Sequence, residues 1–187
     1  LNYEETGNCL YLNNWLIRAK STSITSVTLK NTTVGICRAA FANCISLGEI
    51  VLPNTLKSIG EVAFSNCGIS FISIPSSVEY MGERVFFECP NITSIEMNNG
   101  IKYIPNYTFY NCPKLIVMHI PDSVESIGIE AFANCGSLIV LTLSNNVYYI
   151  GEDAFEACAN LQFDKYDNCL YLGNWAILAI SENITEV

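Results

Sequence analysis

Nine cysteines and one histidine, His119, are the residues of this 187-residue chain best suited to bind a metal, form disulfides or act as nucleophiles. Cysteine metal sites need ligands brought together, as Cys-x-x-Cys pairs or as Cys/His clusters. Most of the cysteines here instead occur singly, at intervals of 22 or 23 residues. We therefore predict no metal site and no cofactor. The six regularly spaced cysteines are Cys44, Cys67, Cys89, Cys112, Cys135 and Cys158.

The spacing favours buried free thiols over disulfides. Each of the six cysteines ends a segment of the form Ala-Phe-x-x-Cys or a close variant, as in Ala131-Phe132-x-x-Cys135. Stacked coils would bring equivalent cysteines within reach of a bridge, but parallel side chains aim poorly for one. Disulfides between neighbouring coils remain the alternative. If the thiols are free, the number of cysteines does not indicate the redox compartment.

His119 lies between two apolar residues, Met118 and Ile120. Side chains alternate across a strand, so inward neighbours place His119 on the outer face. A lone histidine needs a positioned Ser, Cys or Asp partner to act as a general base, and the pattern offers none. We therefore interpret His119 as a surface residue and predict that the chain is not an enzyme.

These residues are carried by tandem copies of one unit. The cysteines step by 23, 22, 23, 23 and 23 residues, and a phenylalanine precedes each by three. A sustained period of this length indicates a solenoid, whose units bury their apolar faces by stacking. Equivalent residues then form rows along the stack, and the phenylalanines should form an aromatic spine. They are Phe41, Phe64, Phe86, Phe109, Phe132 and Phe155.

Each unit contains two alternating stretches and one turn segment. The first, as in Leu115-x-x-Met118-x-Ile120, predicts a half-buried strand, and Val124-x-x-Ile127 begins the second. We expect the Ala-Phe-x-x-Cys segment to be one turn of α- or 3₁₀-helix. The unit carrying Cys67 is one residue short before its strand, which predicts a small irregularity without a break in the stack.

The two ends of the chain are the same variant unit. Residues 8–27 and 168–187 are identical at thirteen of twenty positions. Asn13-Asn14 separates two short apolar runs, which predicts a β-hairpin. We expect Trp15 and Trp175 to fill the core, with ligand stacking as the alternative. The expected organisation is one solenoid segment over 1–187, a piece of a longer array, with hairpin-containing units near 1–23 and 161–183.

The composition excludes two classes of partner. Half of the residues are apolar, but their runs are far shorter than the roughly 18 residues that a membrane-spanning helix needs. The net charge is −9, and nine Lys and Arg residues are scattered along the chain. Binding to nucleic acid requires clustered cations. We predict no nucleic-acid binding and no membrane insertion by this segment.

The unit resembles the BspA-type class of leucine-rich repeats. The resemblance is best at Ile72-x-Ile-Pro-x-Ser-Val78 and at Ile120-Pro-x-Ser-Val-x-x-Ile-Gly-x-x-Ala-Phe-x-x-Cys135. It implies a leucine-rich-repeat solenoid, a right-handed superhelix of short parallel strands joined by 3₁₀ or helical turns. It also implies a non-catalytic recognition scaffold of a secreted or cell-surface protein, because such proteins occur in host-associated microbes and are linked to adhesion.

The outward positions of the first strand of each unit are the candidate binding residues. Several are apolar, which favours an interaction site, although strands also favour β-branched residues for their own sake. A second row, Tyr80, Tyr103 and Tyr149, should project from another side and could contact carbohydrate or protein. The outward strand positions are Glu49, Phe71, Ser94, Val117 and Val140 in one row, and Val51, Ser73, Glu96, His119 and Thr142 in the other.

The leading functional hypothesis is a scaffold that binds a protein partner through this face, with a host surface or matrix protein as a candidate partner. The alternatives are a structural spacer or stalk without a specific ligand, and a carbohydrate-binding surface. The sequence identifies neither the partner nor the mode of anchoring.

Overall fold

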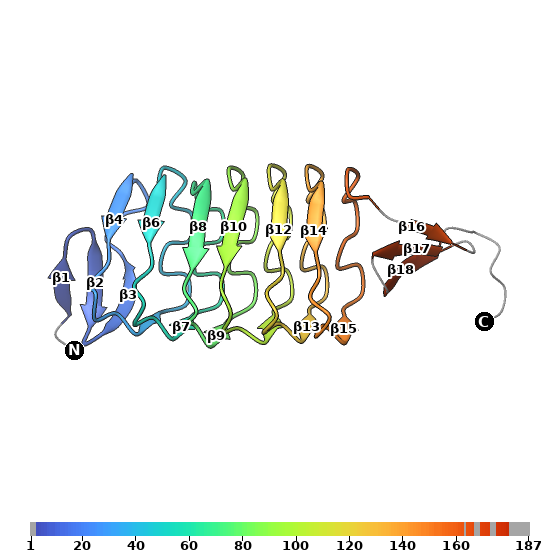
Figure 1. Cartoon of the computed structure of the whole chain (residues 1–187). Helices are drawn as coiled ribbons and strands as arrows, with labels where there is room; N and C mark the ends of the chain where they lie inside the picture. The colour runs from blue at the N-terminus through green and yellow to red at the C-terminus, as the bar shows by residue number, and fades with distance from the viewer. Residues whose placement is uncertain (1–2, 163, 167–168, 173–174, 180–187) are drawn as a thin grey trace.

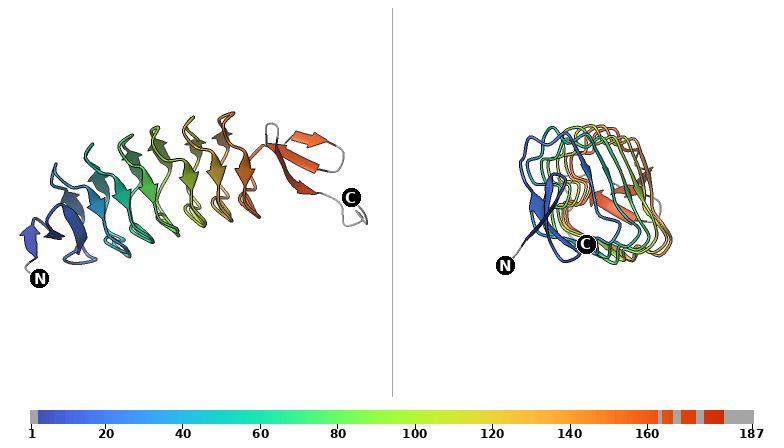
Figure 2. Two further views of the ribbon diagram at one scale, coloured as in Figure 1. Left: turned by 90° about the horizontal axis from the view of Figure 1, so that it is seen from below. Right: turned by 90° about the vertical axis from the view of Figure 1, so that its left-hand side faces the viewer.

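The computed structural model describes residues 3–162, 164–166, 169–172 and 175–179. About six coils of roughly 23 residues stack side by side into a rod (Figure 1). Figure 2 shows the same stack from below and along its axis, where successive coils nearly superimpose. The predicted leucine-rich-repeat solenoid is therefore confirmed.

Each coil contributes two short strands, and most neighbouring coils pair them in parallel. The first strand of each coil is the predicted half-buried strand: β4 (Ser26–Thr28), β6 (Glu49–Val51), β8 (Phe71–Ile74), β10 (Ser94–Met97), β12 (Val117–His119) and β14 (Val140–Thr142). The second strands are β5 (Gly35–Ile36), β7 (Ser58–Ile59), β9 (Tyr80–Met81), β11 (Tyr103–Ile104), β13 (Ser126–Ile127) and β15 (Tyr149–Ile150).

The predicted helical turn at Ala-Phe-x-x-Cys is wrong. Among the described residues these segments are successive tight turns, and in each one the residue before the segment and the residue before the cysteine are left-handed, at φ between 49° and 62°. In one coil the amides of Phe132 and Asn134 donate to carbonyls of the next coil, both at 2.8 Å, while Ala133 donates within its own coil. A helix would keep every such bond within the segment. Left-handed residues prevent this and turn alternate amides toward the next coil.

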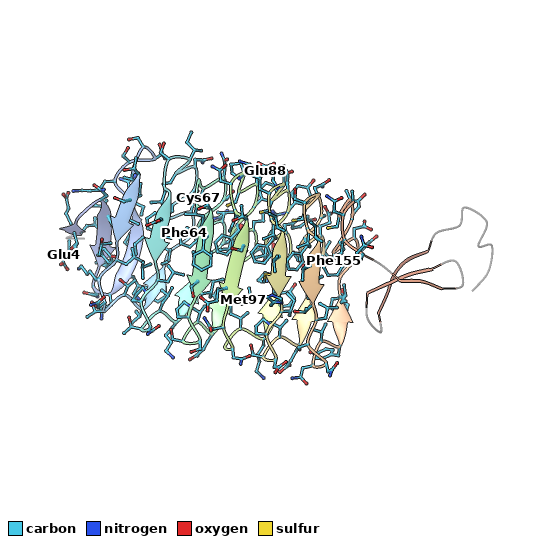
Figure 3. The ribbon with its side chains drawn as sticks, turned by 45° about the horizontal axis from the view of Figure 1, so that its top comes forward. Glu4, Phe64, Cys67, Glu88, Met97 and Phe155 are labelled. Carbon is cyan, nitrogen blue, oxygen red and sulfur yellow. The ribbon has the colours of Figure 1, made fainter. Side chains whose placement is uncertain are left out.

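The core is one continuous column inside the coils. The six spine phenylalanines are buried, and neighbouring rings stack at centroid distances of 5.0 to 5.5 Å. Figure 3 shows the Phe64 side chain inside the coils and Glu88 at the rim. The predicted aromatic spine is confirmed, and it passes through the short unit without interruption, since Phe64 and Phe86 still stack at 5.5 Å.

The variant unit at the N-terminal end is a three-stranded antiparallel sheet of β1 (Glu4–Thr6), β2 (Cys9–Leu12) and β3 (Trp15–Ala19). The hairpin predicted here is β2/β3, and Asn13 in its turn has φ of 55°. β3 also pairs in parallel with β5, which joins the hairpin to the stack. The second copy repeats the arrangement with the same bulge: β16 (Asp164–Tyr166), β17 (Cys169–Leu172) and β18 (Trp175–Ala179).

Trp15 does not fill the core as predicted. Its side chain is 44% exposed, and Tyr11 is the fully buried aromatic of this unit. A Cβ atom on Gly35 would lie 2.3 Å from the Trp15 ring, so the indole lies directly over this glycine of the paired strand. Because Gly35 has no side chain, the Trp15 indole has room over this strand, outside the core. The side chain of Trp175 lies outside the described residues.

Candidate binding surface

The strand face is the outward side of β4, β6, β8, β10, β12 and β14. The last four strands form one parallel sheet in which Ser94 pairs with Phe71 and with Val117, and Val117 pairs with Val140. Ser73 pairs with Glu96. The residues between them, such as Ile72, Ile95 and Met118, are buried. The predicted alternation is therefore correct, and in these coils the outward residues form two rows.

Apolar side chains of the strand face are exposed to solvent. The exposed fractions are 81% for Val51, 50% for Phe71 and 40% for Val140, while Val117 is half-buried. Among the polar positions, Glu49, Glu96 and Thr142 are exposed, and Ser73 and Ser94 are half-buried. The rows thus combine apolar side chains with carboxylates and hydroxyls. Whether they bind a partner stays a prediction.

His119 lies on the outer face, as the alternation predicted. Its Nδ1 atom is 2.8 Å from Oγ1 of Thr142 in the next coil, and both residues are exposed. A threonine hydroxyl can orient the ring but cannot supply the carboxylate of a catalytic triad. This contact is consistent with a surface residue of the strand face.

The strand sheet divides between β6 and β8. β6 pairs only with β4, and β8 only with β10, so among the described residues no strand ladder joins the two sheets. The division follows the short unit, where Gly68 brings the chain close to the preceding coil: a Cβ there would lie 2.1 Å from the Ile45 carbonyl oxygen. The predicted irregularity is present. It breaks the strand sheet, although the core stack continues.

A groove of about 520 Å³ lies along this division. Four of its lining residues, Glu49, Val51, Phe71 and Ser73, are candidate positions from the sequence. Asn54, Pro75, Ser76 and Asn98 line it as well and were missed, because they belong to the connections that follow the strands. The sequence signal that could have located the groove is the shortened unit itself. The structure therefore concentrates the candidate surface around β6 and β8.

The predicted tyrosine row lies on the second strands. Tyr80, Tyr103 and Tyr149 are between 41% and 60% exposed, and Tyr103 and Tyr149 both pair with Ser126 between them. This sheet also divides, between β9 and β11. Pro105 occupies the position where Gly82 and Gly128 donate an amide to the preceding coil, and proline has no such donor.

The cysteine side chains satisfy backbone groups of the turn segments. The thiols of Cys89, Cys112, Cys135 and Cys158 donate to phenylalanine carbonyl oxygens of the preceding coil at 3.1 to 3.2 Å. The eight cysteines in the part of the chain with described side chains are free, and seven of them are buried. Burial raises the pKa of Cys67, Cys89 and Cys158 to about 12. Such thiols are poor nucleophiles because they stay protonated at neutral pH.

The described residues contain neither a candidate metal cluster nor a membrane-spanning helix. No cluster of three or more His, Cys, Asp and Glu side chains there could hold a metal ion. No described helix is long and apolar enough to cross a membrane. The strand face and its groove are the candidate binding surface.

The sequence profile of the BspA type leucine-rich repeat region matches residues 19–139 and 63–185, in six copies. The chain belongs to the BspA-type leucine-rich repeat family. The resemblance inferred from the repeat motif is thereby confirmed. None of the curated proteins matches this family member.

Solved structures of leucine-rich repeat proteins share the fold. A protein from Eubacterium ventriosum matches with a TM-score of 0.75 and 21% identity over 92% of this chain and 53% of its own. The T. pallidum leucine-rich repeat protein matches at 0.65 and 20%, over 86% and 87%. A leucine-rich cell surface protein of Faecalibacterium prausnitzii matches at 0.62 and 26%, over 86% and 38%. The chain thus spans about half the length of the E. ventriosum protein and less of the F. prausnitzii protein.

Proposed function

We propose that this BspA-type leucine-rich repeat chain is a non-catalytic scaffold of a secreted or cell-surface protein, and that it binds another protein through the strand face. The observation that carries the proposal is that Val51, Phe71 and Val140 of the strand face are exposed, and that the first two line a groove. Large apolar side chains that are exposed on one face often mark an interaction site. The cell-surface protein of F. prausnitzii supports the localisation.

Adhesion is the form of binding that we favour. A rod that presents rows of side chains on regularly spaced strands offers a long surface, which suits a large partner better than a small ligand. The partner we infer is a protein of a host surface or matrix. We propose no catalytic role, because the lone histidine contacts a threonine and the buried thiols remain protonated.

Capture of partners from host extracts by the immobilised chain tests the proposal. The variant Phe71→Asp/Val117→Asp/His119→Asp should lose most of the capture, since charges would replace the outward side chains of two strands. The matched control is Tyr80→Asp/Tyr103→Asp/Tyr149→Asp, which places three charges on the second strands. Retained capture by the first variant and loss by the second would move the binding surface to the tyrosine row.

The alternative of a structural spacer predicts a different outcome. A spacer has no specific ligand, so neither triple variant should change what the chain retains. Carbohydrate binding is the other alternative, and the exposed tyrosines are the observation that favours it. A glycan array probed with the chain and with both variants would detect it directly. Circular dichroism should confirm that both variants keep the fold.

A further inference from the structure

The groove between β6 and β8 contains a carboxylate without a cation. Six of the Lys and Arg residues form ion pairs, and two of these pairs join neighbouring coils of the second-strand sheets: Lys57 with Glu79 at 2.7 Å and Lys102 with Glu125 at 2.9 Å. The Glu49 carboxylate makes no ion pair or hydrogen bond with the described residues. Its partner in the paired strand is Ser26, and across the division it lines the groove together with Phe71.

The groove has the two kinds of wall that an arginine side chain requires. Phe71, Val51 and Pro75 give it apolar walls, and the Phe71 ring is half exposed. Ser73, Asn54 and Asn98 also line the groove, and the Asn98 amide nitrogen donates to the Ile74 carbonyl. The oxygens of these side chains can accept hydrogen bonds. No Lys, Arg or His lines the groove.

We propose that this groove binds an arginine side chain of the protein partner, which makes the partner basic at the contact. The planar guanidinium can stack on the Phe71 ring while its N–H groups donate to the Glu49 carboxylate and to the amide oxygens. The aliphatic stem would lie against Val51 and Pro75. The net charge of −9 and the exposed Glu96 on the same face favour the approach of a basic surface.

This inference rests on the proposed function, since it names the chemistry of the partner at one point of the strand face. An anionic guest is disfavoured because Glu49 would repel it and no cation in the groove would hold it. The origin of the site is the short unit. In the continuous sheet of β8, β10, β12 and β14, hydrogen bonding between strands leaves no equivalent division.

The test is an NMR titration of the isotope-labelled chain with the peptide acetyl-Gly-Arg-Gly-amide and with its citrulline analogue. Citrulline has nearly the same shape but no charge. We expect the arginine peptide to shift the amide signals of residues 49–54 and 70–76, and the citrulline peptide to bind at least about fivefold more weakly. Raising the NaCl concentration should weaken only the arginine peptide, because exposed charge pairs are screened.

Two matched variants make the test specific. Glu49→Gln should lower the affinity for the arginine peptide at least about fivefold, whereas Glu96→Gln removes a charge from the same face outside the groove and should change it less than about twofold. Both side chains are exposed, so both variants should fold, and circular dichroism checks this. Equal binding of the two peptides, or full binding by Glu49→Gln, would overturn the inference.

The outcomes separate this inference from the proposed function. If a neutral oligosaccharide such as chitotriose shifts the groove signals and the arginine peptide does not, the guest is a sugar and the inference is wrong. If the arginine peptide does not bind but the Phe71/Val117/His119 variant still loses partner capture, the strand face binds protein through other residues. If the peptide binds and that variant keeps its capture, the groove is real but the proposed function fails.

Discussion

The turn side of the rod, formed by the Ala-Phe-x-x-Cys segments, is continuous, whereas its strand side is divided. On the turn side, rings stack from Phe41 to Phe155 with centroid distances that vary by only half an ångström, and amides of the first five segments donate to the next coil. On the strand side, the sheet ends at β6 and begins again at β8. Stability can therefore come mainly from one side, which leaves the other free to vary in sequence and shape.

The largest effect should come from alkaline pH, because it acts on the turn side in many coils at once. Burial raises the pKa of Cys67, Cys89 and Cys158 from 9.0 to about 12. Below pH 9 these thiols are protonated in both states, so the folded chain keeps its full stability. Between pH 9 and 12 the unfolded chain loses these protons first, and the free energy of unfolding must fall.

Urea unfolding at pH 8, 9.5 and 10.5 with a reductant measures this fall. Tyr and Lys also titrate in this range, so Cys89→Ser serves as the control, since serine keeps a donor for the Phe64 carbonyl but does not ionise there. The variant should lose less stability than the parent chain between pH 8 and 10.5. An identical loss in both chains would mean that the buried thiols do not carry the effect.

The repeat period was enough to predict the turn side in outline but not in detail. The spacing predicted that the phenylalanines and cysteines lie in rows, because stacked coils align equivalent positions. The helix prediction is wrong because the residue before each of the six cysteines is left-handed, and in four of the segments this residue is asparagine. Asn43, Asn66, Asn111 and Asn134 all have positive φ, and asparagine is among the residues that tolerate it best.

The strand side was predictable in alternation but not in continuity. Outward and inward positions follow from a period of two, so the candidate residues fell on the correct face. The missing residue of the short unit was visible in the sequence. Its structural consequence was not visible, because the missing residue could be accommodated either in the core or in the strand sheet. The core stays packed and the sheet divides. This arrangement costs less free energy, because a gap in the spine would leave a cavity among buried rings.

The same substitution, Phe to Ala, made on each side of the rod compares how much the two sides contribute to stability. Phe109→Ala removes a fully buried spine ring and should destabilise the chain by about 3 to 5 kcal/mol, from lost burial and from the cavity. Phe71→Ala removes a half-exposed ring of the strand face and should cost about 1 kcal/mol or less. Chemical denaturation of both variants gives the difference. Similar losses would show that the strand side contributes as much to stability as the spine.

The smallest of these effects concerns Gly68, which lies where the two sides meet. Gly68 follows Cys67, and Gly136 follows Cys135. A Cβ at Gly68 would lie 2.1 Å from the Ile45 carbonyl oxygen, whereas a Cβ at Gly136 would meet nothing within 4 Å. The contact at Gly68 is with backbone, so it cannot be relieved by a side-chain rotation. Gly68→Ala should therefore cost about 1 to 3 kcal/mol, the usual range for overpacking.

Gly136→Ala is the matched control and should change the stability by less than about 0.5 kcal/mol. Denaturation gives both values, and NMR adds a local measurement: Gly68→Ala should shift the signals of β6 and β8 more than those of β12 and β14. Close approach at Gly68 is what lets a coil one residue short keep its phenylalanine in the spine. If Gly68→Ala proved as harmless as Gly136→Ala, the division of the strand sheet would need a cause other than the shortened coil.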